Sequence, residues 1–202
     1  MSSIALTIFA QRHQEANEDH QVKAVPDPIA DDTLAQRAAR GDELAFTELV
    51  DRFQVPARRL ARVLLSSDSL ADEAAQEVFL KLWERRQKLV DLRPPLNVKG
   101  YVLAATRNHC VSILRRRKIL RFVGLDSEPA SAPPPLELRV TLAHAMGRLS
   151  ESHRTVLALR FLEGLDYKEI GAVIGRKPEV ARSRVHYALK AIRGHLPEEL
   201  AP

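Results

Sequence analysis

The stretch DYKEIGAVIGRKPEVARSRVHYALKAIR, residues 166–193, determines the fold of the C-terminal part of this chain. Asp166 with a Glu three residues later is a capping arrangement, which predicts a short helix over 167–174. Gly175 permits a left-handed turn, and a second helix, 178–195, begins at a proline that suits a first helical turn. A short helix, a glycine turn and a basic helix are typical of a helix-turn-helix.

The second helix of this motif has an apolar and a polar face. Apolar residues recur at helical spacing along one stripe, which we assign to the core: Ala181, Val185, Ala188, Leu189, Ile192 and Leu196. The opposite face carries Glu179, Arg182, Ser183, His186, Tyr187, Lys190 and Arg193. Arginine can bind a guanine edge through two hydrogen bonds, and serine and tyrosine can contact phosphate, sugar or a thymine methyl group. The face fits the major groove of DNA, and a solvated charged helix is the alternative.

A second basic segment ends a long predicted helix that begins at Asn97 and runs toward Arg117. Residues 107–121 hold six Arg and Lys and no acid, and residues 176–195 hold six Arg and Lys against one Glu. Basic groups bind phosphates, and an aromatic or amide side chain can receive an unstacked base. The long helix also carries Tyr101, Arg107, Asn108 and His109. The two basic segments indicate two separate contacts with nucleic acid.

A proline-rich segment, GLDSEPASAPPPLE at 124–137, lies between the two basic segments. Its four prolines cannot continue a helix, so an extended linker is predicted. We therefore expect an all-α fold of two small helical domains joined by this linker, the second a helix-turn-helix domain. The predicted divisions are a leader (1–30), an N-terminal domain (31–121), the linker (122–135), a C-terminal domain (136–196) and a tail (197–202).

Apolar spacing predicts the helices of the N-terminal domain. One helix ends at a Gly-Asp break, and Pro56 is expected to kink or interrupt the next. Ser69 and Asp72 predict the start of a third helix. Its apolar face is assigned to Ala75, Val78, Phe79, Leu82, Trp83 and Val90.

Composition excludes several classes of protein. The 202 residues are 45% hydrophobic and 28% charged with a net charge of +5, which is typical of a soluble globular protein. The single cysteine, Cys110, excludes an internal disulfide and a multi-cysteine zinc site. No apolar run approaches the roughly 18 residues of a membrane helix, so we expect a cytoplasmic chain without membrane insertion. Phosphate-loop, hydrolase and metalloprotease motifs are absent, and we predict no enzyme activity, cofactor or metal.

Four segments carry a family resemblance. AQRAARGDELAFTELVDRF (35–53), DEAAQEVFLKLWERR (72–86) and NVKGYVLAATRNHCVSILRRRK (97–118) resemble region 2 of extracytoplasmic-function sigma factors. The segment from LSESHRTV to ALKAIR (149–193) is similar to their region 4. The similarity covers about residues 33–196 in the family's order, and is more specific than a lone helix-turn-helix.

The resemblance implies a subunit that binds core RNA polymerase and directs it to promoters. The helix matching 72–86 would dock on polymerase, and its candidate contacts are Asp72, Gln76, Glu77, Lys81 and Glu84. The segment matching 97–118 would meet the −10 element and capture a base of the melted non-template strand. Its candidate contacts are Tyr101, Arg107, Asn108, Arg115, Arg116 and Arg117.

The resemblance assigns the remaining segments in the same way. The helix matching 178–193 would read the −35 element of double-stranded promoter DNA. Its candidate contacts are Lys177, Arg182, Ser183, Arg184, His186, Tyr187 and Lys190. The linker, made acidic by Asp126 and Glu128, would thread toward the active cleft of polymerase. An anti-sigma factor is a further implied partner.

Two other hypotheses for the function each explain part of the sequence. A helix-turn-helix regulator would act as a symmetric dimer on palindromic sites, but it leaves residues 69–118 without a role. A sigma-like mimic would titrate an anti-sigma factor without binding promoters. A mimic has no need of the intact basic face on 178–193, which favours the sigma factor.

Overall fold

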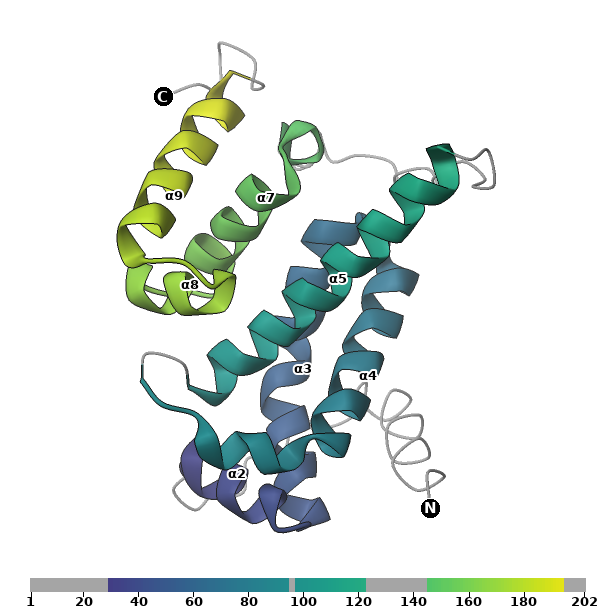
Figure 1. Cartoon of the computed structure of the whole chain (residues 1–202), viewed down its shortest axis with the longest axis vertical. Helices are drawn as coiled ribbons and strands as arrows, with labels where there is room; N and C mark the ends of the chain where they lie inside the picture. Colours follow the sequence, from purple (N-terminus) through teal and green to yellow (C-terminus); the bar gives the residue numbers. More distant parts are fainter. Residues whose placement is uncertain (1–28, 95–96, 123–144, 195–202) are drawn as a thin grey trace, which may run out of the picture.

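The computed structural model describes residues 29–94, 97–122 and 145–194, and all regular structure in these ranges is helical (Figure 1). The N-terminal unit consists of α2 (Asp31–Ala39), α3 (Glu43–Leu65), α4 (Asp68–Glu84), the 3-10 helix η1 (Arg86–Asp91) and α5 (Val98–Phe122). The C-terminal unit contains α7 (Glu151–Leu157), the π-helical turn η2 (Ala158–Leu162), α8 (Tyr167–Ile174) and α9 (Pro178–Arg193). The leader up to residue 28, nearly all of the linker with Asp126 and Glu128, and the tail lie outside the described residues.

Helix caps fix the lengths of the N-terminal helices. The side chain of Asp42 accepts a hydrogen bond of 3.0 Å from the Ala45 amide at the start of α3. Asn97 accepts one of 2.8 Å from the Gly100 amide and begins α5, as the sequence predicted. Apolar faces of α2, α3, α4 and α5 then enclose a core whose larger buried side chains are Leu34, Leu49, Phe53, Val78, Phe79, Leu82, Val98 and Val102.

Two local predictions in this unit are wrong, and a third is narrowed. Of the kink or interruption expected at Pro56, the interruption does not occur, because α3 buries side chains on both sides of the proline and this packing outweighs the one hydrogen bond that proline cannot donate. The cap of α4 is Ser67, which accepts from the Leu70 amide, and not Ser69. Leu89 is buried in place of Val90, because the tighter 3-10 winding of η1 shifts which side chain faces the core.

The C-terminal unit follows the predicted helix-turn-helix closely. Asp166 and Glu169 form a complete capping box, with hydrogen bonds of 2.8 and 2.9 Å to each other's backbone amides. Gly175 has a φ of +64° and ends α8, and Pro178 occupies the first turn of α9. The π-helical winding of η2 had no counterpart in the prediction.

The two units are packed against each other (Figure 1). α8 lies on α5, and α7 and η2 lie on α3. One hydrophobic cluster runs through both units, with Leu60, Leu64 and Leu103 from the first and Leu157, Leu159 and Ile170 from the second. We call this packing the closed arrangement. None of the described helices is both long and apolar enough to cross a membrane.

Candidate nucleic-acid interface

The outer face of α9 is an exposed basic surface. Ala181, Val185, Ala188 and Ile192 are buried, and the opposite side exposes Arg182, Ser183, His186, Tyr187 and Lys190. The rings of His186 and Tyr187 meet edge to face with centroids 5.7 Å apart, and Tyr187 is 62% exposed. Within the part of the chain that the structure describes, the basic side chains at positions 177, 182, 184 and 190 form no ion pair. Lys177, Arg182 and Lys190 are exposed and therefore available to phosphates or bases, whereas Arg184 is half-buried.

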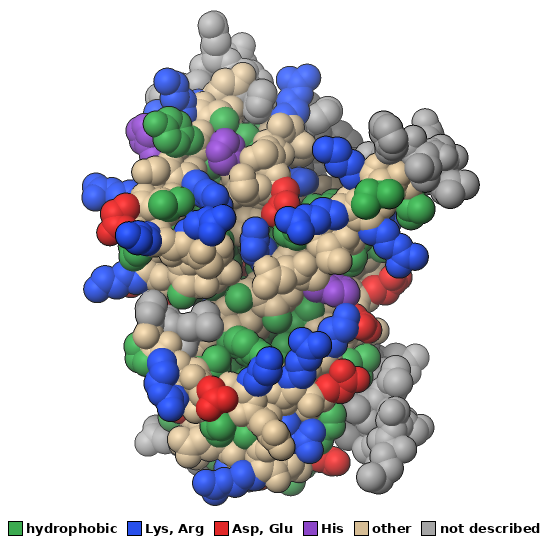
Figure 2. All heavy atoms as spheres, in the orientation of Figure 1, with side chains coloured by type: hydrophobic (Ala, Val, Ile, Leu, Met, Phe, Trp, Pro, Cys, Tyr) green, Lys and Arg blue, Asp and Glu red, His purple; other side chains and the backbone are tan. Residues whose placement is uncertain are grey.

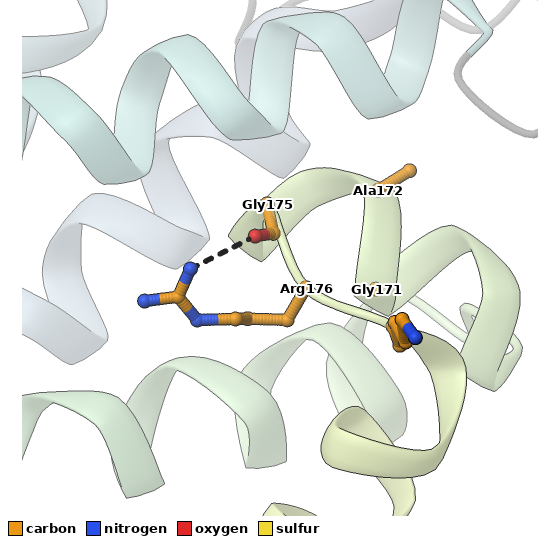
Figure 3. Close-up of a pocket in the computed structure, with 5 residues that line it drawn as sticks. Gly171, Ala172, Gly175 and Arg176 are labelled. Carbon is orange, nitrogen blue, oxygen red and sulfur yellow. Dashed lines mark hydrogen bonds between the residues drawn. The ribbon is translucent and has the colours of Figure 1, made fainter.

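The turn before α9 requires a glycine. A Cβ built on Gly171 would lie 2.7 Å from the backbone oxygen of Arg176, so only a glycine lets the turn approach α8 this closely. The amide of Arg176 donates a hydrogen bond of 2.8 Å to the Gly171 carbonyl. A shallow hollow lies at this turn, where Arg176 extends outward and donates to the Gly175 carbonyl at 3.3 Å (Figure 3). Both Arg176 and Lys177 are exposed, and Lys177 directly precedes the first turn of α9.

The candidate −10 residues fall into two groups on α5. Tyr101, Asn108 and Arg115 are spaced seven residues apart and share one face of the helix. Asn108, Arg115 and Arg116 are exposed, whereas Tyr101 and Arg117 are half-buried. Figure 2 shows that Lys and Arg side chains outnumber acidic ones across both units on the face that it presents.

Arg107 points away from that face, toward the C-terminal unit. Its Nη2 lies 3.8 Å from Oε1 of Glu151 on α7, and its Nη1 donates a hydrogen bond of 3.0 Å to Asn108 Oδ1. Its Nε is buried without a hydrogen-bond partner among the described residues. In the closed arrangement Arg107 therefore contacts both Glu151 of the C-terminal unit and the neighbouring candidate −10 residue Asn108.

The candidate polymerase contacts form one broad surface of α4. Asp72 is ion-paired with Arg58 of α3, and Gln76 and Glu84 are unpaired among the described side chains. Oε1 of Glu77 lies 2.9 Å from Nζ of Lys81, whose hydrogen bond lowers the pKa of the Glu77 carboxyl. Burial lowers the pKa of the neighbouring His109, and the positive charge of Lys81 adds to this effect.

One polar cluster at the contact between the units was missed by the sequence reasoning. Glu163 follows η2, and its side chain is 1% exposed. Arg59 of α3 donates from Nε and Nη2 to its two carboxylate oxygens at 3.0 and 3.2 Å. Lys99 of α5 donates to the Glu163 carbonyl at 2.8 Å and lies 3.6 Å from Oε2. We call these three residues the Glu163 junction. Arg59 and Lys99 lie 104 and 64 positions from Glu163 in the sequence, so no local pattern could have revealed the contact.

The described residues contain no cluster of His, Cys, Asp and Glu that could hold a metal ion. Cys110 is completely buried on α5, and burial raises the pKa of its thiol to about 12. A thiol so rarely ionised is a poor nucleophile.

The fold and these surfaces define a two-unit helical DNA-binding protein with a C-terminal helix-turn-helix. Two family models match the chain: Sigma-70 region 2 over residues 49–119 and Sigma-70, region 4 over residues 145–194. The chain belongs to the sigma-70 family, in its extracytoplasmic-function group.

Characterised relatives support this placement. The chain is 30% identical over 171 residues to the ECF RNA polymerase sigma factor SigE of Mycolicibacterium smegmatis, covering 78% of this chain and 65% of that protein. It is 28% identical over 161 residues to the ECF RNA polymerase sigma factor RpoE of Cereibacter sphaeroides, covering 77% of this chain and 88% of that protein. The chain thus spans slightly under two thirds of the first relative and most of the second.

Solved structures show the same fold. CnrH, solved in complex with the cytosolic domain of CnrY, is 24% identical with a TM-score of 0.62, and the match covers 82% of this chain and 96% of that one. The sigma factor RpoE of Bartonella quintana, solved with the anti-sigma factor NepR, is 22% identical with a TM-score of 0.61, covering 74% and 95%.

Proposed function

We propose that this chain is a promoter-recognition subunit that binds core RNA polymerase and directs it to −10 and −35 elements. The chain supplies binding and positioning, and polymerase supplies the chemistry of RNA synthesis. It acts in the cytoplasm, where polymerase meets the chromosome.

The observation that carries this proposal is the presence of two different basic helices in one chain. α9 is the second helix of the helix-turn-helix and exposes Arg and Lys side chains that form no ion pair with the described residues. α5 exposes Asn108 and Arg115 in a separate helical unit. The two units coincide with the matches to sigma regions 4 and 2. A dimeric regulator accounts only for the C-terminal unit, and a titrating mimic does not need the exposed basic face of α9.

The contact roles follow from where each surface lies. We assign the α4 surface to polymerase, the α5 face bearing Tyr101 and Asn108 to the melted non-template strand, and the outer face of α9 to the −35 duplex. An anti-sigma factor is a further proposed partner, supported by the relatives CnrH and RpoE, which were solved with CnrY and NepR.

Run-off transcription with purified core polymerase and a pool of genomic fragments tests the function. We expect transcripts with defined starts that require both this chain and core polymerase, with the chain active as a monomer. Transcription that needs no added chain, or a chain that binds DNA only as a dimer and never binds core polymerase, would contradict the proposal.

Two variants separate the surfaces in this assay. Gln76→Ala on α4 should weaken core binding without changing the −35 preference, and Gln36→Ala, the same substitution at an exposed position of α2, serves as its matched control. Asn108→Ala should leave recruitment intact and reduce strand opening, measured by permanganate reactivity of unpaired thymines. Normal opening by Asn108→Ala would remove Asn108 from the strand-capture surface.

A further inference from the structure

One exposed apolar side chain lies within the basic C-terminal end of α5. Ile119 is 64% exposed and directly follows the three arginines and the lysine at positions 115–118. In Figure 1 this end of α5 projects beyond α3 and α4. A hydrocarbon side chain forms no hydrogen bond with a phosphate. Phosphate binding therefore explains the cationic neighbours of Ile119 but not Ile119 itself.

Helix geometry places Ile119 on the same side of α5 as the candidate −10 residues. Tyr101 and Ile119 are 18 residues apart, which is five turns of an α-helix, so the two side chains share one line along α5. Arg115 and Arg116 are exposed four and three residues before Ile119, and they flank this line. The face that we assign to promoter DNA therefore continues for five turns and includes Ile119.

The length of this face is sufficient to reach from melted DNA into duplex DNA. A rise of 18 residues is about 27 Å, which is the length of about eight base pairs. Tyr101 and Asn108 are assigned to the melted strand, at the near end of the face. From the C-terminal end of α5 the chain continues to the unit proposed for the −35 element, which is upstream of the −10 element. The end of α5 that bears Ile119 is therefore directed upstream, toward DNA that is still double-stranded.

Duplex DNA offers this end of α5 both phosphates and an apolar group. Within the part of the chain that the structure describes, Arg115, Arg116 and Lys118 form no ion pair, so they are available to phosphates. The apolar group in the major groove is the C5-methyl of thymine. A β-branched side chain such as that of Ile119 is stiff and loses little conformational freedom when it packs against such a methyl. Phosphate binding on both sides would hold Ile119 at the bases.

We propose that Ile119 contacts the methyl group of a thymine in the duplex immediately upstream of the −10 element and adds a sequence preference there. The inference rests on the proposed function. Arginine contacts to phosphates position the helix but carry no sequence information, whereas Ile119 distinguishes thymine from cytosine, which lacks the methyl group. A membrane surface fits this end less well, because membrane binding requires a wide apolar face. Ile113 and Leu114 instead pack against the hydrophobic cluster of the protein.

A promoter library tests the preference. The eight base pairs upstream of the −10 element are randomised and transcribed by core polymerase with the wild type or with Ile119→Ser. We expect the wild type to enrich thymine at one position and Ile119→Ser to lose this enrichment while it still starts transcripts at the same site. Ile119→Val keeps a branched apolar side chain and should keep most of the preference. Leu44→Ser is the matched control, because Leu44 is 79% exposed on α3, and it should keep the full preference.

Uracil at the preferred position removes the methyl group alone. Open-complex formation by the wild type should fall about fourfold, which is the effect of one buried methyl-sized group. Ile119→Ser should be insensitive to the replacement, because the variant and the uracil remove the same contact. 5-Methylcytosine at this position should be preferred over cytosine by the wild type and not by Ile119→Ser. Equal sensitivity of both proteins to uracil would overturn the contact.

The outcomes separate this inference from the proposed function. Transcripts with defined starts but without an upstream thymine preference would refute the role of Ile119 and leave the proposed function standing. A library that gives no transcripts dependent on this chain would refute the proposed function, and the contact with it. Flotation with vesicles that contain phosphatidylglycerol tests the membrane directly. If Ile119→Ser keeps the thymine preference but loses vesicle binding, the side chain contacts a membrane and the proposal is wrong.

Discussion

Cys110 is buried in the core that the two units share, and its thiol makes the stability of the folded chain depend on pH in the alkaline range. Burial raises the pKa of its thiol from 9.0 to about 12, so the unfolded chain loses this proton first as the pH rises. The stabilisation of the folded chain by the buried, protonated thiol is complete below pH 9 and is lost as the pH rises from 9 to about 12. At pH 10.5 the loss is about 2 kcal/mol of unfolding free energy.

Denaturant unfolding of the wild type and Cys110→Ala at pH 8 and pH 10.5 measures this loss. Other groups that titrate in this range act equally in both proteins, so the wild type should lose about 2 kcal/mol more than the variant. The stability difference between the two proteins should not change between pH 6 and 8. Parallel pH dependences up to pH 10.5 would show that the thiol is not buried in the native chain.

Arg182 tests base readout by the outer face of α9. Its side chain is exposed and lacks an ion-pair partner among the described residues, so Arg182→Ala should not disturb folding. If Arg182 binds a base edge, its loss should cost about 1–3 kcal/mol and relax the preference at one position of the −35 element. Transcription from a promoter library by the variant holoenzyme measures both quantities, and Arg148→Ala outside α9 is the control. A uniform loss across all sequences would instead assign Arg182 to a phosphate.

The sequence predicted the conformation and exposure of some residues correctly and failed for others. The cap at Asp166, the left-handed Gly175 and the exposed face of α9 were predicted correctly because each depends on neighbours within one helical turn. The direction of Arg107 could not be predicted in the same way. Its position depends on Glu151, which lies on a different unit of the chain.

At the level of elements, the contact between α8 and the turn before α9 depends on Gly171. Gly171→Ala would place a methyl group 2.7 Å from a backbone oxygen that cannot rotate away. We expect a loss of about 1–3 kcal/mol in stability, because the turn must shift to relieve the overlap. Thermal unfolding followed by circular dichroism measures it.

Gly147→Ala is the matched control for this substitution. An added Cβ at Gly147 meets no atom within 4 Å, so its melting temperature should be unchanged or slightly higher. Gly171→Ala should also weaken −35 binding more than its loss of stability explains, since α9 would be reoriented. Equal melting temperatures for the two variants would show that the turn tolerates a side chain.

The helices themselves were predictable where apolar spacing and capping agreed, as in α8 and α9. They were not predictable where packing overrides a local rule. α3 continues through Pro56 because Phe53 and Ala57 are both buried against neighbouring helices. The π-helical turn η2 has no distinguishing residue pattern, and the cap of α4 was misplaced because serines occupy positions 66, 67 and 69.

At the scale of the whole molecule, the sequence predicted two helical units but not how they pack. The resemblance to two sigma regions comes from patterns within each unit. The shared cluster and the Glu163 junction depend on pairs such as Arg59 and Glu163, 104 positions apart. The closed arrangement is thus the property of this chain that only the three-dimensional structure supplies.

The shared cluster also predicts how the intact chain unfolds. Leu60, Leu64 and Leu103 are buried with residues of the C-terminal unit, so neither unit can unfold without exposing apolar surface of the other. Scanning calorimetry of the intact chain should therefore give one transition whose calorimetric and van't Hoff enthalpies agree. Arg59→Glu should divide it into two transitions, because separated units melt independently, whereas Arg62→Glu should preserve one. Two transitions in the unmodified chain would mean that the units are already separate in solution, and one unchanged transition in Arg59→Glu would mean that the apolar contacts alone hold them together.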